Sequence, residues 1–235
     1  MIKYFVALLF CSQYIFSQNT DHLDTVLKQL KLKKTEINLD LFTQKVLPND
    51  KSKRVMVVPK YTSEVSNDYF VLDAYILVID NATGKIIYKF IEPDAWTSDA
   101  IILNNITIDT GLYILNNTTR AFGVRTSYHN TSRSNPYSEM NLSLYIVNNN
   151  SLKPVLKNYI LQQSIGDWDT HCKGEFENET STINIDKLQT KKFNNLIVKT
   201  KIVKTKNMFK NGDCDDKETT KVLSSKLIFN GKEYK

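Results

Sequence analysis

Short runs of apolar residues separated by polar turns dominate the chain from about residue 53 onward. Runs that are rich in β-branched and aromatic residues, or that alternate apolar and polar positions, lie at 55–58, 69–80, 85–91, 100–108, 112–116, 120–128, 141–147, 153–162, 180–186, 195–206 and 219–229. Such runs predict β-strands, because successive strand side chains point to opposite faces of a sheet. We therefore expect an all-β protein, a mainly antiparallel sandwich or curled sheet with a short N-terminal helix.

The run at 69–80 is apolar on both faces. One face carries Phe70, Leu72, Ile76 and Val78, and the other carries Val71, Tyr75, Leu77 and Ile79. A strand covered on both sides belongs in the middle of a sheet, so this run predicts a central strand. Residues 80–84 supply turn chemistry, which predicts a hairpin with the run at 85–91.

Two hairpins in the chain, at 74–88 and 142–156, resemble each other. Similar units recur in propellers, which need at least four blades of about 40 to 45 residues each. Residues 55–234 have room for four blades, but no repeat returns at a constant period. A small propeller-like arrangement is thus the alternative to the sandwich. The β domain is expected to span residues 53–235 as a single unit with a disulfide-bonded C-terminal part.

The segment that precedes the β domain, residues 18–52, contains one amphipathic stretch. Leu23, Val26, Leu27 and Leu30 share the spacing of a helical stripe, and lysines gather towards its end. Thr20 is a suitable N-cap. The pattern predicts a helix over about residues 21–33, followed by a connecting segment.

Residues 1–17 have the composition of a secretory signal peptide. Lys3 is followed by an apolar run at 4–10 and by the small residue Ser17. Cleavage after Ser17 would leave 218 residues (235 − 17) and a formal charge of +5, since Lys3 is lost from a total of +6. The apolar run is far shorter than the roughly 20 residues of a membrane-spanning helix. We expect a secreted or periplasmic protein without a transmembrane segment. Lipidation at Cys11 is the alternative, but Phe10 is bulky for such a cleavage site.

After that cleavage, Cys172 and Cys214 are the remaining cysteines. Two cysteines in an exported chain predict one disulfide. Closing a loop of this length is worth about 4 kcal/mol in the chain-entropy description. A reactive thiol or a metal-binding pair is the alternative.

The sequence carries none of the best-marked catalytic signatures. The histidines are His22, His129 and His171, and none belongs to a spaced zinc motif; a nucleophile elbow, a phosphate-binding glycine loop and a dinucleotide fingerprint are also missing. This favours a non-catalytic protein, although enzymes without such marks exist.

Two acidic clusters flank the cysteines. Asp167, Asp169 and His171 alternate, so they would project together from an extended segment. Asp213, Asp215 and Asp216 form an oxygen-rich turn of the kind that suits Ca²⁺, without the glycine and the closing glutamate of an EF-hand. A disulfide would bring the two clusters together. No cofactor is expected, with a shared Ca²⁺ or other cation site as the alternative to two solvated turns.

The polar stretch at 129–139 is long for a hairpin connection, and long loops are often functional. Arg133, Asn135, Tyr137 and Glu139 alternate along it. They offer a planar cation, an amide, an aromatic ring and a carboxylate, which suits recognition of a protein or glycan. The alternative is a solvated loop with Tyr137 packed on the core.

The net charge of +6 does not by itself indicate a nucleic-acid partner. Lys199 and Lys201 lie on the polar side of an amphipathic strand-like run, and acidic residues accompany the lysines throughout the chain. We expect no nucleic-acid binding, and only weak attraction to anionic envelope polymers.

Residues 69–214 resemble uncharacterised exported β proteins of bacteria. The resemblance rests on a Leu-Asp-Ala-Tyr strand at 72–75, a Ser-Asn-Pro-Tyr loop at 134–137 and the Asp-rich cysteine turn. It implies an exported location and no particular activity. We expect a non-catalytic binding protein of the cell envelope with a protein or glycan partner. The alternatives are a cation-assisted hydrolase or glycan-active enzyme, and an inhibitor or immunity-like protein for an envelope enzyme.

Overall fold

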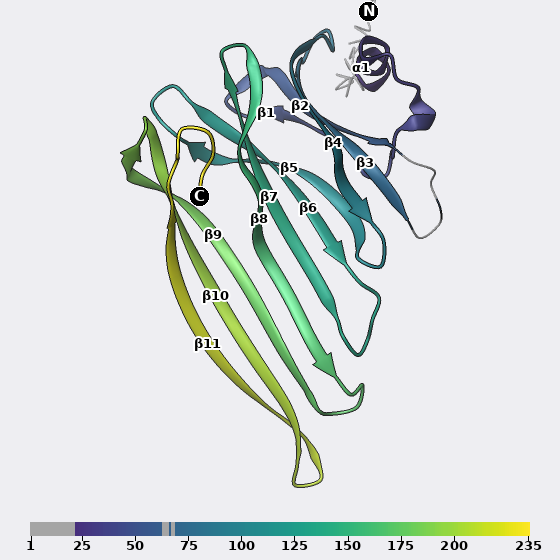
Figure 1. The fold of residues 1–235 in the computed structure, drawn as a ribbon, viewed down its shortest axis with the longest axis vertical. Coiled ribbons are helices and arrows are strands. Elements are labelled where there is room, and N and C mark those ends of the chain that lie inside the picture. The colour runs from purple at the N-terminus through teal and green to yellow at the C-terminus, as the bar shows by residue number, and fades with distance from the viewer. Residues whose placement is uncertain (1–21, 63–65, 67–68) are drawn as a thin grey trace, which may run out of the picture.

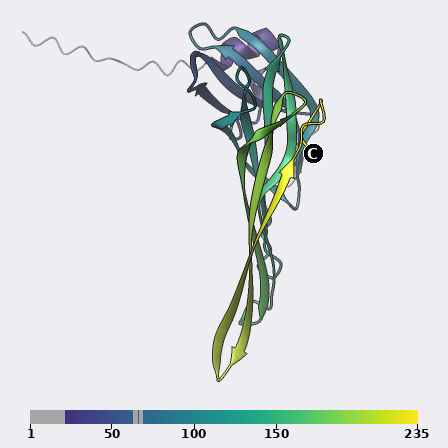
Figure 2. The same ribbon diagram turned by 90° about the vertical axis from the view of Figure 1, so that its left-hand side faces the viewer.

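The computed structural model describes residues 22–62, 66 and 69–235 (Figures 1 and 2). The chain forms one short helix, a 3₁₀ turn and two antiparallel sheets of four and seven strands. The elements are α1 (Leu23–Leu30), the 3₁₀ turn (Lys34–Glu36), β1 (Thr43–Leu47), β2 (Asp50–Tyr61), β3 (Phe70–Asp80), β4 (Ile86–Ser98), β5 (Ile102–Ile114), β6 (Arg120–His129), β7 (Tyr137–Asn148), β8 (Ser151–Trp168), β9 (Gly174–Thr190), β10 (Phe193–Lys210) and β11 (Asp213–Leu227). The predicted all-β antiparallel fold is confirmed.

The four-stranded sheet has the order β1-β2-β3-β4, so β3 is internal, as its two apolar faces predict. One face of β3 buries Leu72, Ile76 and Val78 in the core between the two sheets. The opposite face buries Leu77 and Ile79 beneath α1. Because both faces are covered, the strand needs apolar residues at nearly every position.

Helix α1 is shorter than the sequence predicts, but it buries the predicted stripe of Leu23, Val26 and Leu27 against the four-stranded sheet. The side chain of Gln29 fixes the helix to the β3–β4 turn, donating to the Gly84 carbonyl at 2.9 Å and accepting from the Ile86 amide at 3.0 Å. Within the described part of the chain, no helix is long and apolar enough to cross a membrane. The expected signal peptide, Cys11 and the Thr20 cap lie outside the described residues.

The seven-stranded sheet runs in the order β11-β10-β9-β8-β7-β6-β5, a meander in which neighbours in sequence are neighbours in space. Its upper part carries two cores. On one face, Phe122, Val124 and Tyr145 pack against the four-stranded sheet and complete the sandwich.

A second core lies on the other face of the upper sheet. There Leu142, Leu144 and Leu196 pack with Phe229 and Tyr234 of the C-terminal segment. Backbone hydrogen bonds hold the covering segments in place. The Asn194 amide donates to the Leu115 carbonyl at 2.6 Å, and the Tyr234 amide donates to the Val155 carbonyl at 2.7 Å. The upper ends of β9 to β11 and the C-terminal segment thus cover this face.

Below the cores, β8 to β11 continue as a long curved extension that narrows to a tip, most clearly seen edge-on in Figure 2. We call its residues, 162–182 and 199–224, the arm. The structure describes every residue of the arm, and none of them is buried, so both faces of the arm are in contact with solvent. The arm is held by strand pairing and not by a core of its own.

Three details differ from the sequence-based expectation. Residues 43–47, expected in a connecting segment, form β1, since their pairing with β2 and not their own pattern makes them a strand. The runs at 100–108 and 112–116 join into the single strand β5, whose pairing with β6 shifts register between Asp109 and Tyr113. The two sheets are not arranged as repeated propeller blades, so the propeller alternative is wrong.

Candidate functional site

The loop predicted at 129–139 is shorter in the structure, because β6 ends at His129 and β7 begins at Tyr137. Asn130 closes it from within. Its side chain donates to the Asn135 carbonyl at 2.8 Å and accepts from the Tyr137 amide at 3.0 Å. The loop is therefore a compact connection built around one asparagine.

The same loop docks on the arm. The Gly166 amide donates to the Pro136 carbonyl at 3.0 Å, and the Trp168 amide donates to the Ser134 carbonyl at 2.7 Å. The Asn135 side chain reaches the Asp167 carboxylate at 3.4 Å. The loop thus continues the sheet beside β8 and braces the last residues of that strand, next to the β8–β9 turn.

Tyr137 and Glu139 belong to a hydrogen-bond network on the face of the sheet. The Tyr137 hydroxyl donates to Glu139 at 2.6 Å, and the amides of Asn141 and Gln163 donate to the same carboxylate. Burial raises the pKa of the Tyr137 phenol, and its hydrogen bond to Glu139 raises it further. These two side chains are already partnered within the sheet.

Of the four residues predicted to recognise a partner, Arg133 is exposed, and its side chain makes no hydrogen bond or ion pair with any residue that the structure describes. Asn135 holds the loop on β8, and Tyr137 and Glu139 hold β7. The structure brings all four to the junction of loop and arm, but it gives three of them a structural contact.

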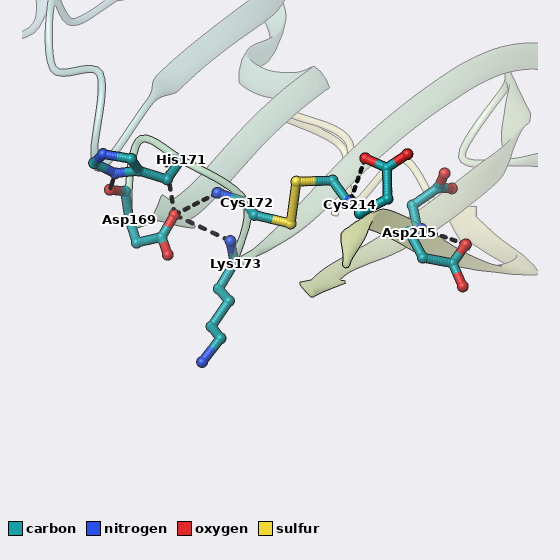
Figure 3. Close-up of a disulfide and its surroundings, with 8 residues drawn as sticks. Asp169, His171, Cys172, Lys173, Cys214 and Asp215 are labelled. Carbon is teal, nitrogen blue, oxygen red and sulfur yellow. Dashed lines mark hydrogen bonds between the residues drawn. A yellow bond between two sulfur atoms is a disulfide. The ribbon is translucent and has the colours of Figure 1, made fainter. Parts of the chain in front are cut away.

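Cys172 and Cys214 form a disulfide at the far end of the arm (Figure 3). Their Cα atoms are 5.6 Å apart. Cys172 lies in the turn between β8 and β9, and Cys214 lies just after the turn between β10 and β11. The bond therefore joins the tips of two hairpins, and Asp169 and Asp215 lie on opposite sides of it in Figure 3.

The carboxylates at this tip accept hydrogen bonds from the turns (Figure 3). Asp169 accepts from the amides of His171, Cys172 and Lys173 at 2.8, 2.9 and 3.0 Å. These donors, the amide of His171 foremost, hold the pKa of Asp169 below its usual value. The Cys214 amide donates to Asp213 in the same way, at 2.8 Å.

The remaining residues of the predicted cation site are spread along the tip. Asp167 faces Asn135, and His171 Nδ1 lies 3.0 Å from the Asp169 carbonyl. Asp215 accepts from the Asp216 amide and pairs with Lys210 at 3.3 Å. Among the described residues, no three His, Cys, Asp or Glu side chains are grouped as metal ligands. Cation binding here stays a prediction.

The face of the arm next to β11 is hollowed. A depression of about 560 Å³ lies over Ile165 and Phe176 and is bordered by charged side chains of all four strands, β8 to β11. Lys204 pairs with Glu177 at 2.6 Å, and Lys206 pairs with Glu175. The hollow therefore combines an apolar floor with a charged border.

β11 forms one edge of the seven-stranded sheet, opposite the edge formed by β5. It pairs with β10 along its whole length, and no other strand that the structure describes pairs with it. Every residue of β11 except Leu227 is exposed, and the side chain of Val222 is 65% exposed. An unpaired edge of this length is a template for another strand.

A larger hollow, of about 740 Å³, lies at the opposite end of the molecule from the arm's tip, beside the β9–β10 turn and the C-terminal segment. Five lysines line it, namely Lys153, Lys157, Lys191, Lys192 and Lys232, together with Phe90, Phe193 and Phe229. We call it the lysine groove. The sequence analysis missed it, because its lysines come from distant segments of the chain and only the adjacent pair Lys191-Lys192 gives a local signal.

The fold and its surfaces define the protein as an antiparallel, sandwich-like all-β protein with a disulfide-tipped arm. No protein-family model, curated protein or solved structure matches the chain. The resemblance to exported bacterial β proteins, and the function, therefore stay predictions.

Proposed function

We propose that this chain is an exported, non-catalytic binding protein that holds a protein partner along β11 of the arm. The observation that carries the proposal is the arm itself. Four strands extend past both cores, expose both faces and end in a disulfide. Such an extension buries little apolar surface for the residues it orders, so its use lies in the surface it presents.

The free edge of β11 suggests how a partner would be held. An extended peptide that adds a strand to a sheet edge gains main-chain hydrogen bonds, while side chains near the edge supply specificity. Here Val222 offers an exposed apolar contact on one face, and Leu223, 41% exposed, offers one on the other. The hollow over Ile165 and Phe176 lies next to this edge.

The charges along β11 favour a partner strand in which acidic residues also precede basic residues. The first part of β11 is mainly acidic, with Asp213, Asp215, Asp216 and Glu218 around the single Lys217, and the second part carries Lys221 and Lys226. When such a partner pairs antiparallel to β11, its basic residues lie opposite the acidic part of β11 and its acidic residues lie opposite the basic part. Opposite charges across the pair favour this alignment of the two strands. The disulfide is in keeping with the oxidising compartment of an exported protein.

The test compares two exposed apolar residues on opposite edges of the same sheet. Val222→Lys places a charge on β11, and Leu112→Lys does the same on β5, where Leu112 is 72% exposed. Both variants should fold, because neither side chain is buried. Each tagged protein is incubated with an envelope extract, and the retained proteins are compared by mass spectrometry and by light scattering of the purified chains.

We expect a partner that is retained by the wild type and by Leu112→Lys and is lost from Val222→Lys. If the partner is a second copy of the chain, light scattering gives a dimer that Val222→Lys converts to a monomer. Equal retention by both variants, or no stoichiometric partner of either kind, would overturn the proposal.

A further inference from the structure

Three two-residue hairpin turns of the seven-stranded sheet adopt the left-handed conformation at both central positions. The β7–β8 turn uses Asn149 and Asn150, the β10–β11 turn uses Asn211 and Gly212, and the β9–β10 turn uses Lys191 and Lys192. Turns of this kind suit the twist of a hairpin, but they require positive φ at both residues. Asparagine and glycine adopt positive φ at little energetic cost, whereas lysine adopts it at a higher cost.

Lys191 and Lys192 have φ values of 48° and 74°. Backbone strain of this kind persists where the surrounding structure demands it, and such places are often functional. The same sheet makes two equivalent turns with asparagine and glycine, so the fold itself does not require lysine here. A functional role of the two lysine side chains would explain why they occupy this strained turn.

The strained turn is fastened from both sides. The Asn116 side chain donates to the Lys192 carbonyl at 3.1 Å, and Lys191 Nζ donates to the Asn230 carbonyl at 2.6 Å. Behind the turn, the rings of Phe193 and Phe229 lie 4.6 Å apart. The turn is therefore held in place at the rim of the lysine groove.

The groove carries a surplus of positive charge. Against its five lysines stands one lining carboxylate, Glu233, which pairs with Lys235 at 3.0 Å just outside the lining. Lys157 pairs with Glu92. Lys153, Lys191, Lys192 and Lys232 form no ion pair with any residue that the structure describes.

We propose that the lysine groove is an anion-binding site for a ligand that carries two or more phosphate groups. Lysine binds phosphate as a compact point charge, and several lysines around one hollow suit a multiply charged ligand better than a single carboxylate. Phe90, Pro154 and Phe229 form apolar lining on which the carbon framework of such a ligand can rest. The size of the hollow is that of a small-molecule site.

This site is separate from the partner edge on β11 and is tested separately. The probe is inorganic tripolyphosphate, titrated calorimetrically at low ionic strength into the oxidised protein. Lys191→Gln with Lys192→Gln removes two groove charges. The control, Lys199→Gln with Lys201→Gln, removes two exposed lysines from the arm.

We expect binding that weakens with added salt, falls at least about tenfold in the groove variant and changes less than about twofold in the control. A second variant, Lys191→Asn with Lys192→Gly, should lose binding equally while its melting temperature rises, because it relieves the strain. No binding at low salt, or equal weakening by the control pair, would overturn the proposal.

Lipid headgroups and soluble phosphates share this chemistry, and a second experiment distinguishes the two sources. Vesicles of phosphatidylcholine, with and without cardiolipin, whose headgroup carries two phosphates, are sedimented with the protein. Sedimentation that needs the anionic lipid and is reversed by tripolyphosphate identifies a headgroup as the source. Tripolyphosphate binding without sedimentation identifies a soluble phosphorylated ligand.

Discussion

Phe176 of β9 lies across Gly166, its direct partner on β8. A Cβ atom added to Gly166 would stand 2.6 Å from Phe176 Cδ1 and 2.9 Å from Pro136 Cγ. Glycine is needed here because the Phe176 ring and the docked loop occupy the space that a side chain would fill. The pair thus couples the loop at 130–136 to the end of the β8–β9 hairpin.

Gly166→Ala should destabilise the protein by about 1–3 kcal/mol, the range for inserting a carbon into occupied space. Thermal or urea unfolding measures the loss. Phe176→Ala removes the obstructing ring, so a double-mutant cycle provides the control. Gly166→Ala should cost clearly less in the Phe176→Ala background, and an equal cost in both backgrounds would show that the ring is not the obstacle.

Asp109 is the acceptor at the bulge of β5, and it should make stability depend on pH in acid. Burial raises its pKa, but hydrogen bonds from the Tyr113 hydroxyl at 2.7 Å and from Arg125 at 2.6 Å outweigh burial, so the pKa lies below its usual value. The carboxylate therefore stabilises the fold above its unfolded-state pKa, and this contribution is lost as the pH falls through the lower folded-state value.

Asp109→Asn should lower the free energy of unfolding at neutral pH by about 1–3 kcal/mol, because Arg125 loses its charged acceptor. Urea unfolding between pH 7 and pH 3 measures this difference. The gap between variant and wild type should shrink as the pH falls below about 4. A gap that stays constant down to pH 3 would mean that the Asp109 charge is not the source.

Reduction of the Cys172–Cys214 disulfide should loosen the tip of the arm before anything else. The chain-entropy estimate for this loop is about 4 kcal/mol. Because the arm is exposed on both faces, the first consequence is local opening. Amide hydrogen exchange should accelerate at 168–174 and 208–216 and stay unchanged in β3, which serves as the internal reference. Uniform acceleration across the chain, or none, would contradict this.

Tyr137 and Arg133 should differ in how much they contribute to stability. Tyr137→Phe removes the hydroxyl that donates to Glu139 and should cost about 1 kcal/mol of stability. Arg133→Ala should leave the melting temperature unchanged, because Arg133 is exposed and its side chain makes no hydrogen bond or ion pair with a described residue. Differential scanning fluorimetry distinguishes the two, and a loss from Arg133→Ala as large as that from Tyr137→Phe would contradict the assignment.

The amino-acid sequence alone is sufficient for the class of the fold and for several local features. The doubly apolar run at 69–80 predicts an internal strand, and the stripe of Leu23, Val26 and Leu27 predicts α1. Both follow from local periodicity, which depends only on which face of an element is buried. The pairing of Cys172 with Cys214 follows from counting, because no other cysteine follows the predicted cleavage site.

Tertiary structure decides the features that depend on residues far apart in sequence. Residues 43–47 become β1 only because β2 offers an edge, and the runs of β8 to β11 extend past their apolar patterns because each strand pairs with the next. Tyr137 and Glu139, predicted as recognition residues, form hydrogen bonds within β7 and to Gln163 of β8. The lysine groove draws on β8, the β9–β10 turn and the C-terminal segment. No local sequence pattern predicts that these distant segments lie together, because side-chain periodicity determines which face of an element is buried but not which element packs against that face.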